Sequence, residues 1–443
     1  MAASTKISRT LLAPGVKSLR SYLQSELDAL RRAPVLLISS EAGAVETSSN
    51  NINTIKAVAD SCQWMKFTLG QQFAMRTVST TISSAFPTKD SLEQTLELMQ
   101  RTGASSVVSV GSGAAMDLGK AVQANLVGSS CSSNSNSDGA QNTSKNTPLI
   151  LVPTTYSGIL AAGASHSLFL DAEEDTLVPL PQHHQGILEA ATPDGTGAHH
   201  ATVSTLEPQT YMEHLDADKF DVLLYAVSAI LVDAGLRKST HLSLPILLQD
   251  TIDLISLRDT INAPTTTTDS DVAKVSSEMM ALTTPLMNLL YQSAGLLSYG
   301  LSSDGGFDEE DNRSITLALG SSLIPTLFPE THPLSFIASL APGICRYYSE
   351  QQQQQQPRNN IDNDANEKLL GTLVDRLQDQ FSGGGNASMR SPPSLVPNDE
   401  SLQGFSVPDM ALSHIQTNQA VWNPLDFPDD VLVEVLQHCM KQQ

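Results

Sequence analysis

Residues 105–120 read SSVVSVGSGAAMDLGK, and this stretch indicates the fold of the first half of the chain. Ser105–Val110 is an apolar run with the length of a buried parallel strand. Gly111-Ser-Gly113 follows it directly and opens a helical stretch, Ala115–Leu126. Small residues at such a turn let backbone N–H groups approach a pyrophosphate, whose charge the helix N-terminus favours. The alternative is a tight strand-to-helix turn that binds nothing.

Three further apolar runs predict strands of the same sheet: Val35–Ser40, Pro148–Val152 and Ser228–Asp233. Between the first two, Pro87-Thr-Lys-Asp opens a predicted helix. Strands that alternate with helices are typical of a parallel sheet covered by helices on both faces. The sequence therefore predicts an α/β N-terminal dinucleotide-binding domain with a parallel sheet.

The pattern changes after residue 238, where the apolar runs become longer and take helical spacing. These runs are Leu242–Leu257, Val272–Tyr299, Ile315–Leu327 and Pro333–Tyr348. We expect a domain over residues 1–238, with a disordered insertion at 129–147, followed by an all-α domain over 239–443. Two low-complexity loops, 349–366 and 382–399, interrupt the helical domain, because such compositions cannot bury enough apolar area to order themselves.

Composition limits the classes of function. The net charge of −22 disfavours a nucleic-acid or anionic-membrane surface, which needs clustered Lys and Arg. No apolar run reaches the length of a membrane helix. The four cysteines form no CxxC pair, so neither a zinc ribbon nor a disulfide framework is indicated, and a reducing compartment is expected.

The first 25 residues contain basic, serine and threonine residues but no acidic residue. That composition suits an organellar transit peptide. The alternative is structural, with Thr10–Gly15 as a first strand and turn and Lys17–Leu30 as a helix. We expect a cytoplasmic protein, with organellar import as the alternative.

A second polar turn follows the predicted strand Pro148–Val152, where the chain reads Pro153-Thr-Thr-Tyr-Ser-Gly158. Consecutive hydroxyls at the carboxyl edge of a parallel sheet can bind a nucleotide base or ribose. The alternative is that they cap the next helix.

These segments together resemble the iron-containing alcohol dehydrogenase family, and Pro153-Thr-Thr-Tyr156 resembles its maleylacetate reductase branch. Gly111–Lys120 is similar to the family's Gly-Gly-Gly-Ser-x-x-Asp-x-x-Lys phosphate loop. Further similarities follow in the family's order along the chain: Ile230–Leu236, Pro329–His332, Leu340–Pro342 with Arg346-Tyr347, and Asn423-Pro424 with the final helix Pro428–Met440.

The resemblance implies the family's architecture, which the dehydroquinate synthases share, with NAD or NADP bound in a cleft that faces the helical domain. It implies that the pyrophosphate lies on the phosphate loop and that the hydroxyl turn lies by the adenine side. The implied cofactor-binding residues are Gly111, Ser112, Gly113, Ala114, Asp117, Lys120, Thr154 and Thr155. The cofactor choice stays open, because Ser40 stands where an acid would favour the free ribose hydroxyl of NAD.

The implied metal site is incomplete. Asp250 and His332 match two of the family's four ligands, whereas Leu254 replaces the first His and Leu317–Leu323 contains no His. A leucine cannot coordinate iron or zinc, so a divalent metal is doubtful. Asp253 could complete a two-carboxylate, one-histidine set; alternatively, the two aspartates are helix-terminal charge caps.

Two functions remain open. The first is an NAD(P)-dependent oxidoreductase that acts on a small carbonyl or enol substrate, with His332 as proton donor or oxyanion stabiliser. The second is a catalytically inactive relative that keeps the fold, with or without dinucleotide binding, for a regulatory or scaffolding role. The expected partner is a small-molecule substrate, without nucleic acid or membrane, and a homodimer is compatible with the resemblance. Phosphate-sugar chemistry like that of the dehydroquinate synthases is a third option, which lacks the expected Lys and Arg contacts.

Overall fold

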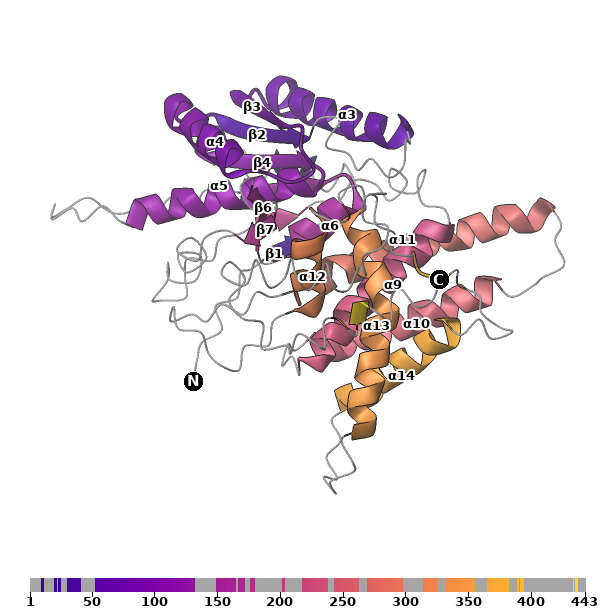
Figure 1. The fold of residues 1–443 in the computed structure, drawn as a ribbon. Coiled ribbons are helices and arrows are strands. Elements are labelled where there is room, and N and C mark those ends of the chain that lie inside the picture. Colours follow the sequence, from indigo (N-terminus) through magenta and orange to yellow (C-terminus); the bar gives the residue numbers. More distant parts are fainter. Residues whose placement is uncertain are drawn as a thin grey trace, which may run out of the picture.

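The computed structural model places a parallel sheet with its helices beside a group of packed helices formed by the second half of the chain (Figure 1). The described residues are 9–11, 20–21, 23–24, 30–40, 52–131, 149–164, 166–171, 176–179, 201–203, 217–237, 243–262, 269–297, 314–325, 328, 332–354, 365–381, 389, 391–393, 433 and 435–436. The fold class predicted from the sequence is confirmed.

The main sheet has six strands, all parallel, in the order β1-β8-β5-β4-β2-β3. The strands are β1 (Arg9–Leu11), β2 (Val35–Ser40), β3 (Thr77–Ile82), β4 (Ser106–Gly111), β5 (Leu149–Pro153) and β8 (Ala201–Val203). Every residue of β2, β4 and β5 is buried, as expected for central strands that are covered on both faces. The predicted strands at 35–40, 105–110 and 148–152 are therefore confirmed.

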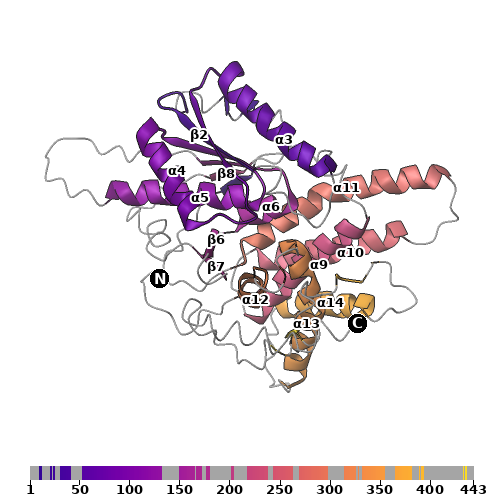
Figure 2. The same cartoon turned by 45° about the horizontal axis from the view of Figure 1, so that its top comes forward.

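Helices cover both faces of the sheet. Helix α3 (Ile52–Phe67) packs on one face, while α4 (Lys89–Thr102) and α5 (Gly113–Cys131) pack on the other (Figure 2). The faces differ because the chain passes from β2 to β3 in one direction and from β3 to β4 in the other, and such crossovers are right-handed. Strand order therefore reverses at β2, and open parallel sheets bind ligands beyond the carboxyl ends of the two strands at such a point, here β2 and β4.

Shorter elements complete the α/β half. A π-helix, Thr68–Gln72, extends α3, and α6 (Tyr156–Gly163) follows β5. Strands β6 (Leu168–Asp171) and β7 (Thr176–Pro179) form an antiparallel pair outside the main sheet. Sequence periodicity did not predict β3, β6, β7 or β8.

The second half is helical, as predicted. Its helices are α9 (Ala217–Leu236), α10 (Leu244–Asn262), α11 (Asp269–Ala294), α12 (Ile315–Leu323), α13 (Pro333–Gln354) and α14 (Ala365–Phe381). Helix α9 is central, since it contacts each of the other five. The domain boundary at residue 238 stays a prediction, although α9 packs with the helices that follow that boundary.

The prediction of a strand at Ser228–Asp233 is wrong, because these residues lie inside α9. Ser228–Val232 are fully buried, and a short, continuous apolar run has no periodicity that separates a buried strand from a buried helix. The length of the run decides between the two, because burial is continuous from Leu223 to Ala234, which is longer than a typical strand.

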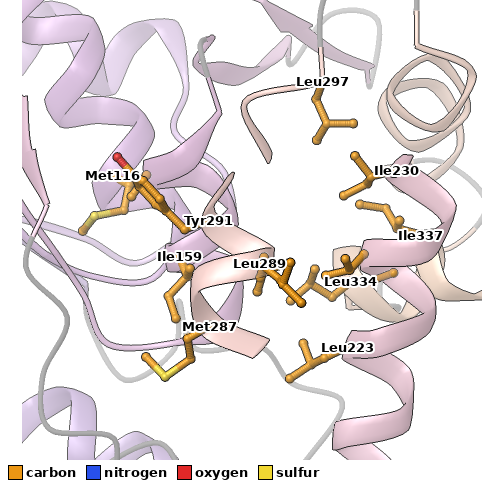
Figure 3. Packing of buried hydrophobic residues seen from close by; sticks show 14 of the residues in the cluster. Met116, Ile159, Leu223, Ile230, Met287, Leu289, Tyr291, Leu297, Leu334 and Ile337 are labelled. Carbon is orange, nitrogen blue, oxygen red and sulfur yellow. The ribbon is translucent and has the colours of Figure 1, made fainter. Parts of the chain in front are cut away.

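The two halves share one hydrophobic core. Figure 3 shows Met116 of α5 and Ile159 of α6 beside Tyr291 and Met287 of α11. At the end of α6, a Cβ on Gly163 would overlap the carbonyl oxygen of Tyr291, so glycine lets α6 and α11 approach backbone to backbone.

Among the described helices, none combines the length and the apolar character needed to cross a bilayer.

Candidate functional site

The predicted phosphate loop lies at the point where the strand order reverses. Strands β2 and β4 are neighbours, with Ser39 paired to Val110, so Ser40 and Gly111 end adjacent strands. Gly111 has φ = 136°, a backbone conformation that L side chains rarely adopt. A Cβ there would also lie 2.7 Å from Ser40 Cβ and 3.0 Å from Ser40 N. Only glycine fits this turn.

Ser40 and Ser112 are hydrogen-bonded between the ends of β2 and β4. The Ser112 N–H donates to Ser40 Oγ at 2.9 Å, and the two hydroxyl oxygens lie 2.8 Å apart. Both residues are buried. The Ser112 amide, which the family resemblance assigns to the pyrophosphate, therefore already has an acceptor within the protein.

The first amides of α5 remain available to a ligand. Helix geometry leaves the N–H groups of the first turn, at Gly113, Ala114 and Ala115, without an intrahelical acceptor. The helix dipole adds positive potential at this end. Gly113 is half-buried and Ala114 is buried, so these donors are largely shielded from solvent. This arrangement can hold a phosphate group.

The hydroxyl turn lies directly beside the glycine turn. Gly111 pairs with Pro153 in the sheet, and Thr154 N–H donates to Gly111 O at 2.9 Å. Thr155 caps α6, because its Oγ1 accepts from Gly158 N at 3.1 Å. Thr154 Oγ1 is buried and has no hydrogen-bond partner among the described residues. Thr155 is thus a capping residue, whereas Thr154 keeps a hydroxyl that a ligand can satisfy.

Asp117 and Lys120 make contacts within the protein. Lys120 Nζ lies 2.9 Å from Asp117 Oδ1 and donates to Ala161 O at 2.6 Å, and it also binds the Ala164 and His166 carbonyls. These carbonyls lie at and just beyond the C-terminal end of α6, where a cation is favourable. Burial raises the pKa of Asp117, and the neighbouring ammonium opposes that rise. The Asp117–Lys120 pair therefore links α5 to the C-terminal end of α6.

The proposed metal ligands do not form a metal site. Asp250 and Asp253 are exposed on α10, whereas Leu254 is buried in the core. Gln249 Nε2 donates to Asp253 Oδ1 at 2.9 Å. Nowhere in the described part of the chain do three His, Cys, Asp or Glu side chains gather in a way that could hold a metal ion. The described residues therefore do not fit the family's metal.

His332 lies at the start of α13. Its Nδ1 accepts from Leu334 N at 3.0 Å, and its carbonyl accepts from Phe336 N at 2.9 Å. These are the contacts of a helix N-cap, and Pro333 takes the first helical position. Because Nδ1 is an acceptor, the neutral ring carries its proton on Nε2. His332 has a structural role, and it is half-buried.

Two buried ion pairs were not predicted from the sequence. Arg258 binds Asp221 through two bonds, Nε to Oδ1 at 2.9 Å and Nη2 to Oδ2 at 3.1 Å. Asp233 accepts from Ser314 and lies 3.4 Å from Arg237 Nε. The i,i+4 spacing of Asp233 and Arg237 could have signalled their pairing if the segment had been predicted as a helix.

The comparisons with known proteins match the segment that contains both turns. Residues 52–171 match the family model of the iron-containing alcohol dehydrogenases. This part of the chain is therefore similar to the iron-containing alcohol dehydrogenases. The match contains both the glycine turn and the hydroxyl turn, so the resemblance predicted from the sequence is confirmed. A search of curated protein sequences finds no significant match.

Solved structures of iron-containing alcohol dehydrogenases and maleylacetate reductases have a similar fold. The iron-containing alcohol dehydrogenase of Thermotoga maritima aligns with a TM-score of 0.57 and 12% identity, over 99% of this chain and 100% of that one. Maleylacetate reductase from Rhizobium sp. strain MTP-10005 gives 0.54 and 14%, over 100% and 98%. The NADH-dependent butanol dehydrogenase A of Thermotoga maritima gives 0.54 and 13%, over 99% and 98%. These likenesses establish the fold.

Proposed function

We propose that this protein is an oxidoreductase that binds NAD or NADP at the β4–α5 turn and reduces a small carbonyl or enol compound without a bound metal. The observation that carries the proposal is the meeting of two turns at the reversal of strand order. There the first-turn amides of α5 adjoin Thr154, whose buried hydroxyl has no partner among the described residues. A dinucleotide supplies a diphosphate for the amides and acceptors for the hydroxyl.

The nicotinamide, when bound, would supply the hydride, and the protein must hold it and supply a proton. Gly113 and Ala114 would hold the phosphates. His332 is the proposed proton donor, because its cap contact keeps a hydrogen on Nε2. Within the described part of the chain, Asp250 has no fitting set of metal donors around it, and this supports a metal-independent reaction. A small-molecule substrate, a homodimer and a cytoplasmic location are part of the same proposal.

A second function, an inactive relative that keeps the fold, is favoured by a different observation. Lys120, Asp117 and the Ser112 amide are all engaged by groups of the protein itself. Binding without turnover would then serve regulation or scaffolding.

Calorimetric titration with NADH and NADPH, with metal analysis of the same sample, tests both functions. We expect binding of at least one reduced nicotinamide and no stoichiometric iron or zinc. Turnover with small aldehydes or maleylacetate-like enols supports the first function, and binding without turnover supports the second. Lack of binding at millimolar concentrations contradicts the first function and leaves an inactive relative that keeps only the fold.

A matched pair of variants locates the site. Gly113→Asp places a carboxylate at the first turn of α5, where it repels phosphate but favours the helix. We expect this variant to fold and to lose dinucleotide binding. Gly371→Asp, on α14, where a Cβ meets nothing within 4 Å, is the control and should bind as the wild type does. Equal loss of binding in both variants would contradict the placement.

A further inference from the structure

We propose that Ser40 is an internal competitor for the dinucleotide's phosphates and so sets the affinity of the site. The proposal rests on the proposed function and concerns one residue outside the phosphate-loop motif. Ser40 ends β2, and the loop follows β4, so the two meet only because these strands are neighbours at the reversal of strand order.

In the free protein, the Ser40 hydroxyl oxygen accepts the hydrogen bond that a phosphate oxygen of the ligand would otherwise accept. Its Oγ accepts the Ser112 N–H at 2.9 Å, which is the length of a good N–H···O bond. That N–H belongs to the turn that leads into the first amides of α5. A phosphate oxygen that is to accept from Ser112 must first displace the Ser40 hydroxyl.

Packing prevents Ser40 from moving aside easily. Its side chain lies over Gly111, where even a Cβ would be 2.7 Å from Ser40 Cβ. Ser40 and Ser112 are 6% and 2% exposed, so water does not replace the bond when it breaks. A ligand must therefore offset the cost of opening a buried hydrogen bond before it gains the Ser112 amide.

The Ser40→Ala variant removes the competitor and leaves the Ser112 amide buried and unsatisfied in the free protein. A bound phosphate would then satisfy it. We expect the Kd for NADH and for ADP to fall about three- to tenfold, the usual worth of one hydrogen bond. The Kd for adenosine, which carries no phosphate, should not change. A merely structural loosening would weaken all three ligands.

Ser39→Ala is the matched control. Ser39 is the preceding residue of the same strand, is also buried, and its hydroxyl lies 3.5 Å from Thr80 O, away from the loop. We expect wild-type affinities for this variant. Equal affinity of wild type and Ser40→Ala for NADH and ADP, or weaker binding by Ser40→Ala, would overturn the proposal.

The outcomes separate this inference from the proposed function. If the wild type binds none of NADH, NADPH and ADP but Ser40→Ala binds ADP, the role of Ser40 as a competitor is confirmed. Dinucleotide binding by the wild-type protein is then excluded. If no variant binds any probe, both fail. Amide hydrogen exchange of the wild type gives a test that needs no variant. Ser112 should exchange much more slowly than Gly113, and equal rates would contradict the buried bond.

Discussion

The carboxylate of Asp233 accepts a hydrogen bond from Ser314 Oγ at 2.6 Å, across 81 positions of the sequence. The same carboxylate accepts from the backbone N–H groups of Ile315 and Thr316, each at 3.2 Å. A side chain of α9 therefore caps α12 from outside that helix. Arg237 completes the cluster, since it binds Asp233 and also donates to Leu296 O at 2.9 Å.

Asp233→Ala should lower the free energy of unfolding by about 3–5 kcal/mol, because it leaves Arg237 buried without its partner and removes the cap of α12. Urea unfolding of the full chain measures the change. The control is Glu350→Ala, which breaks the more exposed pair with Arg346 on α13 and should cost less than about 0.5 kcal/mol. Similar losses in the two variants would show that the Asp233 cluster does not stabilise the helical half.

Gly111→Ala should cost at least about 2 kcal/mol, since it adds a Cβ to a left-handed backbone and drives it against Ser40. Dinucleotide binding should be lost with it, because the turn must move. Gly103→Ala is the control that measures the cost of the backbone conformation alone, without a steric contact. Gly103 has φ = 66° with nothing within 4 Å of a Cβ, so we expect a loss of about 1 kcal/mol. A Gly111→Ala protein as stable as Gly103→Ala would contradict the close contact with Ser40.

Substitutions of His332 distinguish its capping role from its proposed catalytic role. His332→Ala should lower stability by about 1 kcal/mol through loss of the cap on Leu334 N, whereas His332→Asn, a strong capping residue, should stay near the wild type. If His332 also donates a proton, His332→Asn should lose turnover while it keeps stability and NADH affinity. Thermal unfolding and steady-state kinetics measure the two effects separately. Full turnover in His332→Asn would exclude His332 as the proton donor.

The free energy of unfolding should depend on pH through the Asp117 carboxyl, and the direction of its pKa shift sets the sign of that dependence. Burial raises the pKa of its carboxyl in the folded protein above the ordinary value near 3.8, although Lys120 opposes the shift. The folded protein then binds the proton more tightly than the unfolded chain, so this contribution to stability is full below about 3.8 and declines as pH rises through the folded pKa. Asp117→Asn does not titrate. The stability of Asp117→Asn relative to the wild type should therefore increase with pH above 4 in urea unfolding, and a constant difference would contradict the shift.

Local pattern predicted much of the α/β half. The apolar runs that became β2, β4 and β5 are short, fully buried and bounded by turn residues, so their type followed from the sequence. The same reasoning misassigned residues 228–233, because a run buried on all sides has no alternation to separate strand from helix. Strands β1 and β8, next to each other at one side of the sheet, are only three residues long, too short for a periodic signal.

For the candidate site, too, some features follow from the sequence and others only from the tertiary structure. The sequence by itself determined the glycine turn, the hydroxyl turn and the loss of metal-ligand types, because each depends on residue identity at adjacent positions. Only the tertiary structure decided that Ser40 binds the Ser112 amide, that Lys120 fastens α6, and that Asp250 faces outward. Those facts depend on which strands and helices become neighbours, and strand order and helix packing bring together residues that sequence spacing does not relate.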